Sequence, residues 1–327
     1  MKKALISAVM LLAVCTSVIS CGSQKNPLQP TAQDKKIVMR VGGENVEYQE
    51  FRYFFLNNKR DSFGADAVLS DEELNEVISL TEENSRQRHA LIKMAEKYGG
   101  KLTRSEKKAA EEYIEQSIAG FGSDEAYLIA LDEQYLTDHL FREMTKEAGL
   151  AYTVLDKMKE AGAIIENGAD FDKVLESDEI ICIKEIYLTY NSEETKEIVR
   201  NRAEEVLSKL MSGAEFEDMM REYSDYNEAE LPPEHGYYTM KFDALDAVYD
   251  AAINLAADEH SYVVESEYGF HIVKRCEKDT EYMETIRDEI YENYTYAKFS
   301  EEFEAVVDSM DIVYTEYGAS LDLAALS

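Results

Sequence analysis

The chain changes its hydrophobic pattern at Ile180, and this change constrains the fold more than any other feature of the sequence. From Tyr48 to Ala161, apolar residues recur at helical spacing. Residues 180–188 are instead an isoleucine-rich run typical of a strand, and two amphipathic helical segments follow it. The order of strand, two helices, short strand, helix and two strands over residues 180–278 predicts a small α+β domain.

The segment before this domain is predicted to be helical, because its helices carry clear start signals. Ser70 with Glu73, and Thr103 with Glu106, have the spacing of capping boxes, in which two side chains satisfy free N–H groups at a helix start. Two longer helical patterns are Thr137 to Ala161 and Glu281 to about Asp308. Short β-prone runs stand near both ends of the chain, at Ile37–Val41 and Asp311–Thr315.

The N-terminus has the layout of a secretory signal peptide. Lys2 and Lys3 precede an apolar run from Ala4 to Val14, which is too short to remain in a bilayer as a spanning helix. Val18-Ile19-Ser20-Cys21 resembles the lipobox of bacterial lipoproteins, in which the cysteine is acylated. We therefore expect lipidation of Cys21 and an extracytoplasmic location on the outer face of the cell membrane. An ordinary cleaved signal with an incidental cysteine is the alternative.

The composition excludes several classes of function. The formal net charge is −33, which disfavours binding to nucleic acid, although an acidic surface also serves solubility alone. The sequence has no glycine-rich phosphate loop and no histidine pair at metal-ligand spacing, so we expect no cofactor and no metal. Cys182 and Cys276 could form one disulfide or remain two inert buried thiols.

Several motifs within residues 180–278 resemble, in order, those of the parvulin family of peptidyl-prolyl isomerases. They are the strand Ile183–Leu188, the helix end Gly213-Ala214-Glu215-Phe216, the loop entry Glu222-Tyr223-Ser224-Asp225, the turn Gly236-Tyr237-Tyr238, the helix Ala251–Leu255 followed by Ser261, and the closing strand Tyr268-Gly269-Phe270-His271-Ile272-Val273. The resemblance implies a parvulin-type fold and rotation about X-Pro bonds as the activity.

The layout of the whole chain is similar to that of extracytoplasmic foldases of the SurA/PrsA type. Val41 to Phe51 resembles the start of their helical chaperone region. The resemblance implies an inserted parvulin-like domain and a C-terminal helix that completes the helical region. The expected segments are a signal peptide (1–20), a flexible tether (21–36), the helical region (37–177), the parvulin-like domain (178–278), and a C-terminal helix with a short strand (279–327).

The resemblance also implies a set of site residues. His271 stands at the second histidine of the family, and Ser266 at its small hydroxyl residue. Glu185 replaces the first histidine, and Tyr226 replaces a cysteine or aspartate. The expected substrate-binding positions are Tyr238, Val248, His235 and Ala244.

Glu185 is expected to face His271 across adjacent antiparallel strands, which would leave Cys182 and Cys276 diagonal to each other. The pair belongs either to a variant isomerase or to a relict site held by an ion pair. The expected function is a membrane-anchored foldase whose partners are unfolded secreted polypeptides with proline-containing segments. The alternatives are a non-enzymatic holdase chaperone and a scaffold lipoprotein for one fixed partner.

Overall fold

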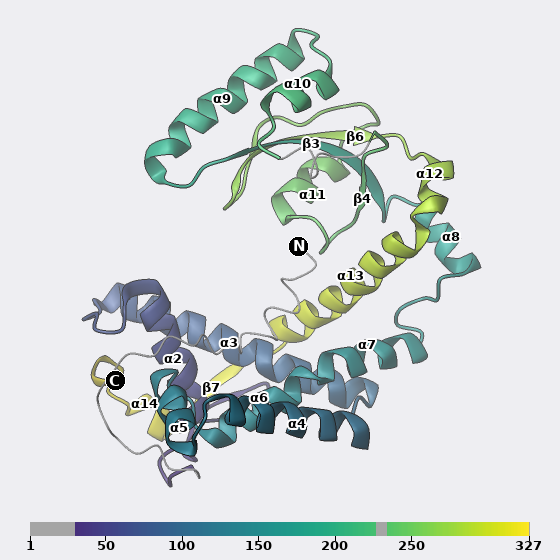
Figure 1. Cartoon of the computed structure of the whole chain (residues 1–327). Coiled ribbons are helices and arrows are strands. Elements are labelled where there is room, and N and C mark those ends of the chain that lie inside the picture. Colours follow the sequence, from purple (N-terminus) through teal and green to yellow (C-terminus); the bar gives the residue numbers. More distant parts are fainter. Residues whose placement is uncertain (1–29, 227–233, 327) are drawn as a thin grey trace. The chain divides into compact units, whose positions relative to one another are not determined.

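The computed structural model describes residues 30–226 and 234–326, and the contacts divide the chain into two compact units (Figure 1). Unit 1 combines the chain up to Ala161 with the chain from Glu302 onward, and unit 2 is Gly162–Glu301. Both units join helices to small antiparallel sheets, so the predicted α+β class is confirmed. Within the described residues, no helix is long and apolar enough to cross a membrane.

Most of unit 1 is helical. The helices are α2 (Tyr48–Phe63), α3 (Asp71–Tyr98), α4 (Arg104–Gly120), α5 (Asp124–Glu133), α6 (Asp138–Ala148) and α7 (Leu150–Glu160). Side-chain caps stand at the start of α3, α4, α5 and α6. Both predicted capping boxes are present, at Ser70 before α3 and at Thr103 before α4.

A three-stranded antiparallel sheet joins the two ends of the described chain within unit 1. Its strands are β2 (Glu44–Glu47), β1 (Ile37–Val41) and β7 (Ile312–Tyr314), in that order, and α14 (Glu316–Ala319) follows β7. Met39 of β1 lies opposite Tyr314 of β7, although 274 other residues separate them in the sequence. The C-terminal segment therefore completes the unit that the N-terminal helices begin.

The prediction of one helix from Thr137 to Ala161 is wrong. Gly149 separates α6 from α7, and its N–H donates to Lys146 O three residues back, at 3.2 Å. Glycine weakens a helix interior because it loses the most backbone freedom on folding. The predicted helix from Glu281 is likewise divided at Ile286, into α12 (Thr280–Thr285) and α13 (Arg287–Asp308).

A buried charged cluster ties three helices of unit 1 together. Arg88 of α3 donates to Glu50 of α2 at 2.5 Å, and its Nε and Nη2 donate to the two carboxylate oxygens of Glu147 of α6 at 2.8 Å. His89 lies 3.2 Å from the same Glu50 carboxylate, which is 3% exposed. Such a cluster depends on every partner, because removing one leaves a buried charge uncompensated.

Unit 2 is built on a four-stranded antiparallel sheet with helices on both faces (Figure 1). The strand order is β4 (Tyr237–Thr239), β3 (Ile181–Thr189), β6 (Gly269–Cys276) and β5 (Val264–Glu265). Helices α9 (Glu193–Met211) and α10 (Phe216–Tyr223) cover one face, and α11 (Asp246–Ile253) covers the other. Helix α8 (Ala169–Glu176), which the sequence pattern did not predict, also belongs to unit 2.

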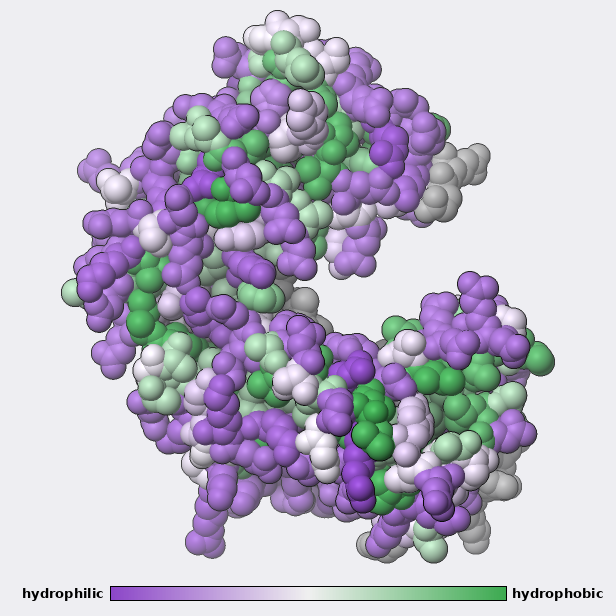
Figure 2. All heavy atoms as spheres, turned by 180° about the vertical axis from the view of Figure 1, so that it is seen from behind, coloured by the Kyte–Doolittle hydropathy of each residue, from purple (hydrophilic) through white to green (hydrophobic). Residues whose placement is uncertain are grey.

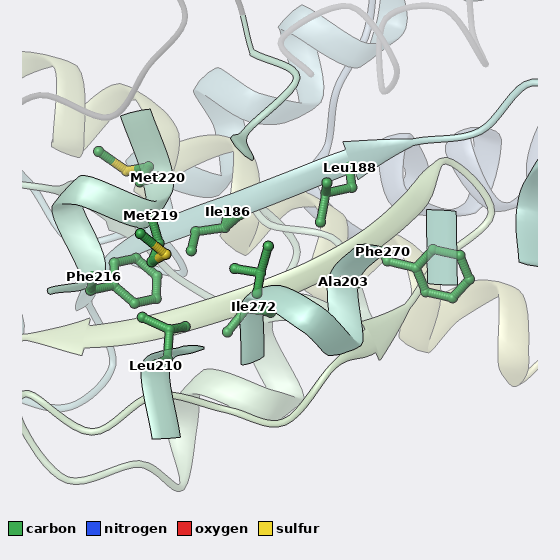
Figure 3. Close-up of a cluster of buried hydrophobic side chains, with 10 residues drawn as sticks. Ile186, Leu188, Ala203, Leu210, Phe216, Met219, Met220, Phe270 and Ile272 are labelled. Atoms are coloured by element: carbon green, nitrogen blue, oxygen red, sulfur yellow. The ribbon is translucent and has the colours of Figure 1, made fainter. Parts of the chain in front are cut away.

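The main core of unit 2 lies between the sheet and α9 and α10 (Figure 3). Ile186 and Leu188 of β3, and Phe270 and Ile272 of β6, are fully buried and point toward these helices. Each such side chain contributes about 1.5–3 kcal/mol on burial. A smaller cluster of Ile181, Ile183, Val248, Ala252 and Val273 packs α11 on the opposite face. The face of the molecule that Figure 2 shows is largely hydrophilic, with apolar patches between the polar residues.

Candidate active site

The face of the sheet that carries α11 also carries a group of polar and aromatic side chains on β3 and β6. Tyr187 lies directly opposite His271, and Glu185 lies opposite Val273. The register is therefore two residues away from the one expected from the sequence, so Glu185 and His271 are diagonal neighbours. Their side chains still meet, because diagonal neighbours on one face of an antiparallel pair are within reach of long side chains.

Four side chains form one continuous hydrogen-bonded chain. The Tyr226 hydroxyl donates to Glu185 Oε2 at 3.0 Å, and Glu185 Oε1 makes a close ion-pair contact with His271 Nδ1. His271 Nε2 lies 2.6 Å from Ser266 Oγ. Glu185 is 8% exposed and His271 2% exposed, so the middle of this chain is shielded from water. The four predicted catalytic positions thus lie together in one network.

The Ser224-Asp225 pair explains how Tyr226 reaches the site. Ser224 Oγ accepts the N–H of Tyr187 at 3.1 Å, and Asp225 N–H donates to Tyr187 O at 2.7 Å. Asp225 also accepts the N–H of Thr189 at 2.9 Å. Ser224 and Asp225 are therefore hydrogen-bonded to the backbone of β3. These bonds place the next residue, Tyr226, beside Glu185.

The turn before β6 places Ser266 against His271. Ser266 N–H donates to Gly269 O at 2.9 Å, and Tyr268 N–H donates to Ser266 Oγ at 3.1 Å. A Cβ at position 269 would stand 2.3 Å from Leu188 O, so only glycine allows β6 to approach β3 at this point. This close approach brings the His271 ring next to Tyr187.

Tyr187 is a site residue that the sequence reasoning missed. Its ring stacks on the His271 imidazole, with centroids 4.8 Å apart and planes 14° apart, and it also contacts the Tyr226 ring at 5.1 Å. Its hydroxyl donates to Tyr268 O at 3.0 Å. The available signal was its position two residues after Glu185, which puts both side chains on the same face of a strand.

Comparison with known proteins gives this domain a family. The family described as "Rotamase: PPIC-type PPIASE domain" matches residues 181–277. Residues 181–277 are a parvulin-type rotamase domain. The resemblance predicted from the motifs is thereby confirmed.

The chain is also homologous to PrsA foldases beyond the rotamase domain. The foldase protein PrsA of Halalkalibacterium halodurans is 32% identical over 173 residues, which is 52% of this chain and 49% of that protein. The foldase protein PrsA of Caldanaerobacter subterraneus is 24% identical over 84% of this chain and 82% of its own length. This chain thus spans about half the length of the first of these relatives. Among solved structures, PrsA from Bacillus anthracis is similar with a TM-score of 0.36 and 19% identity, covering 69% of this chain and 94% of that chain.

The predicted substrate-binding residues of the rotamase domain lie on different elements and make different contacts. Tyr238 lies opposite Cys182 and therefore on the other face of the sheet, and its hydroxyl donates to Asp279 O at 3.1 Å. Val248 is buried in the α11 core, and Ala244 precedes α11. His235 stacks on Tyr282 at 4.2 Å and lies 2.8 Å from Asp279. Cys21 is outside the described residues.

The electrostatics of the site keep its phenols protonated. Burial, and then the negative charge of Glu185, raise the pKa of Tyr226 above its usual value. The same two causes raise the pKa of Tyr187. Each phenol is thus a hydrogen-bond donor at neutral pH. Across residues 30–226 and 234–326, no group of three or more His, Cys, Asp or Glu side chains is arranged to hold a metal ion.

Proposed function

We propose that this protein is an extracytoplasmic foldase, anchored to the membrane by a lipid on Cys21, whose rotamase domain acts on X-Pro bonds of secreted polypeptides. The observation that supports the proposal best is the chain of Tyr226, Glu185, His271 and Ser266 in a parvulin-type domain. Homology to PrsA foldases supports the folding role. The lipid anchor rests on the lipobox-like sequence alone.

Isomerisation needs no nucleophile, because only the partial double bond of the amide must rotate. The barrier is about 18–20 kcal/mol and is set by amide resonance. A catalyst lowers it by binding the twisted amide more tightly than the planar one, using donors that are already in place. In this site, Glu185 fixes the His271 ring from Nδ1, Ser266 holds it from Nε2, and Tyr187 covers one ring face. These contacts fix the imidazole in place, as a preorganised site requires.

The test is the cis-to-trans rate of a proline tetrapeptide with the full chain. We expect a shorter relaxation time than that of the uncatalysed exchange, which takes tens of seconds or more. His271→Ala should remove the acceleration, and His260→Ala, a histidine of the same domain outside the network, should keep it. A wild-type rate equal to the uncatalysed rate, or full activity of His271→Ala, would overturn the isomerase proposal.

A holdase function without isomerisation is the second candidate. It is favoured by Tyr238 and Val248, which are turned to the opposite face and into the core instead of lining a proline pocket. If the protein is a holdase, the wild-type chain and the His271→Ala variant should suppress aggregation of an unfolded client equally well. Loss of suppression in the variant, at unchanged folding, would reject it.

The anchor is tested separately in cells. Wild-type protein should fractionate with membranes and carry an acylated N-terminal cysteine by mass spectrometry. Cys21→Ala should lose the acyl mass and leave the membrane fraction. Unmodified Cys21 in membrane-bound protein would contradict the proposal.

A further inference from the structure

Cys182 and Cys276 face each other on the first and last long strands of the rotamase domain. They are directly opposed in the antiparallel pairing of β3 and β6, and neither is bridged. Directly opposed residues of antiparallel strands share one face, with Cα atoms about 4.5–5.5 Å apart. Disulfides span about 4.4–6.8 Å between Cα atoms. The Cα separation expected from this pairing therefore lies within the range that a disulfide spans.

The two thiols differ in their surroundings. Cys182 is fully buried, and its thiol donates to His235 O at 3.0 Å. Cys276 is partly exposed at the end of β6. The next opposed pair on the same face is Lys184 and Lys274, whose charges favour a nearby thiolate. The neighbouring Cys182 side chain is the main cause that lowers the pKa of Cys276, against the opposing effect of burial, and the two lysines lower it further. The pair thus combines an accessible nucleophile with a buried partner.

We propose that Cys182 and Cys276 form a reversible dithiol–disulfide site. The bond would link β3 to β6 at the two ends of the rotamase domain, residues 181–277. The oxidant is a low-molecular-weight disulfide. The Cys276 thiolate attacks one of its sulfurs and releases one thiol. Cys182 then loses its proton, attacks the Cys276 sulfur and releases the second thiol. Two protein thiols are oxidised to one disulfide, and the small disulfide is reduced to two thiols. This site is independent of the isomerase proposal.

The test uses the full chain with Cys15 and Cys21 replaced by serine, so that Cys182 and Cys276 are the remaining thiols. The folded protein is treated with glutathione disulfide or with dithiothreitol, alkylated, and digested with trypsin without reductant. We expect peptide 174–184 linked to peptide 276–278 after oxidation, an intact mass lower by two hydrogens, and reversal by dithiothreitol. The oxidised domain should also unfold at a higher denaturant concentration than the reduced one, because the bond closes a long loop.

Single-cysteine variants test the order of the two steps. Cys182→Ser should accumulate a glutathione adduct on Cys276, whereas Cys276→Ser should react at least about tenfold more slowly, since its remaining thiol is buried. Two thiols that stay free after oxidation, glutathione adducts without an internal link, or a link between two chains would each overturn the proposal. Equal reactivity of the two variants would overturn the assigned roles.

Discussion

Replacing Glu185 with leucine should destabilise the rotamase domain strongly. The carboxylate accepts the Tyr226 hydroxyl and contacts His271 Nδ1, and both partners are largely shielded from water. Leucine leaves two buried polar groups without an acceptor, at about 1–3 kcal/mol each, so the loss in unfolding free energy is about 2–6 kcal/mol. Even the lower value would reduce the melting temperature of a domain of this size by about 8 °C.

Three further variants separate the hydrogen bonds from other effects. Glu185→Gln keeps the shape and one acceptor, so we expect a loss of about 1 kcal/mol. Glu204→Leu, an exposed glutamate on α9, should change stability by less than about 0.5 kcal/mol. Adding Tyr226→Phe to Glu185→Leu removes one orphaned donor and should restore about 1–3 kcal/mol.

The assay is calorimetry of the full chain, in which the transition of the rotamase domain is assigned by its sensitivity to Phe270→Ala. The reasoning would be refuted if Glu185→Leu melted within about 0.5 kcal/mol of wild type, in the range of ordinary surface substitutions. It would also be refuted if Tyr226→Phe made the leucine variant less stable, since that result would give Tyr226 a partner other than Glu185.

Three other predictions follow from contacts in the two units. Tyr187→Leu removes the ring stacked on His271 and should lower kcat/KM about 2–12-fold, matching about 0.5–1.5 kcal/mol for an aromatic pair, whereas Tyr187→Phe should retain the rate; equal losses in both variants would contradict a stacking role. Burial opposes the charge of Glu217, but its hydrogen bond to Lys184 and the charges of Lys184 and Lys274 lower its pKa to about 2 from 4.5. This stabilisation is present above pH 4.5 and is lost as pH falls toward 2, so the advantage of wild type over Glu217→Gln in urea titrations should shrink over that range, by about 1 kcal/mol because solvent screens the pair; a constant difference would refute it. Arg88→Met leaves buried Glu50 without its main partner and should cost unit 1 about 3–5 kcal/mol, against little change for exposed Arg104→Met; calorimetry showing equal effects would refute the cluster's role.

Much of the fold could be predicted because local signals and global structure agree. The capping boxes at Ser70 and Thr103 start helices in the structure, and the isoleucine-rich run after Ile180 is the central strand β3. The break at Gly149 could not be read from periodicity, because the apolar spacing continues through it while the backbone ladder does not.

Four of the expected site residues lie together in the structure, but the register of the two strands that carry Glu185 and His271 differs from the expected one. The closing strand and the Ser224-Asp225 loop identify His271 and Tyr226 by motif. Whether Glu185 lies opposite His271 or two residues away depends on the pairing of β3 with β6, and no hairpin turn joins these two strands to fix their register. The same limit explains Tyr238, since the face to which it points is set by its pairing with Cys182. It also explains why the direct opposition of Cys182 and Cys276 emerged only from the structure.

The most direct test of the account is a titration of the full chain, labelled at its five histidines, with a proline peptide, followed by NMR. The account predicts saturable shifts and exchange broadening of the His271 ring signals, with those of His89 and His139 in unit 1 unchanged. Binding that perturbs other residues and leaves His271 unchanged, or no saturable binding at all, would contradict the claim that the Tyr226–Glu185–His271–Ser266 network is the site of X-Pro recognition.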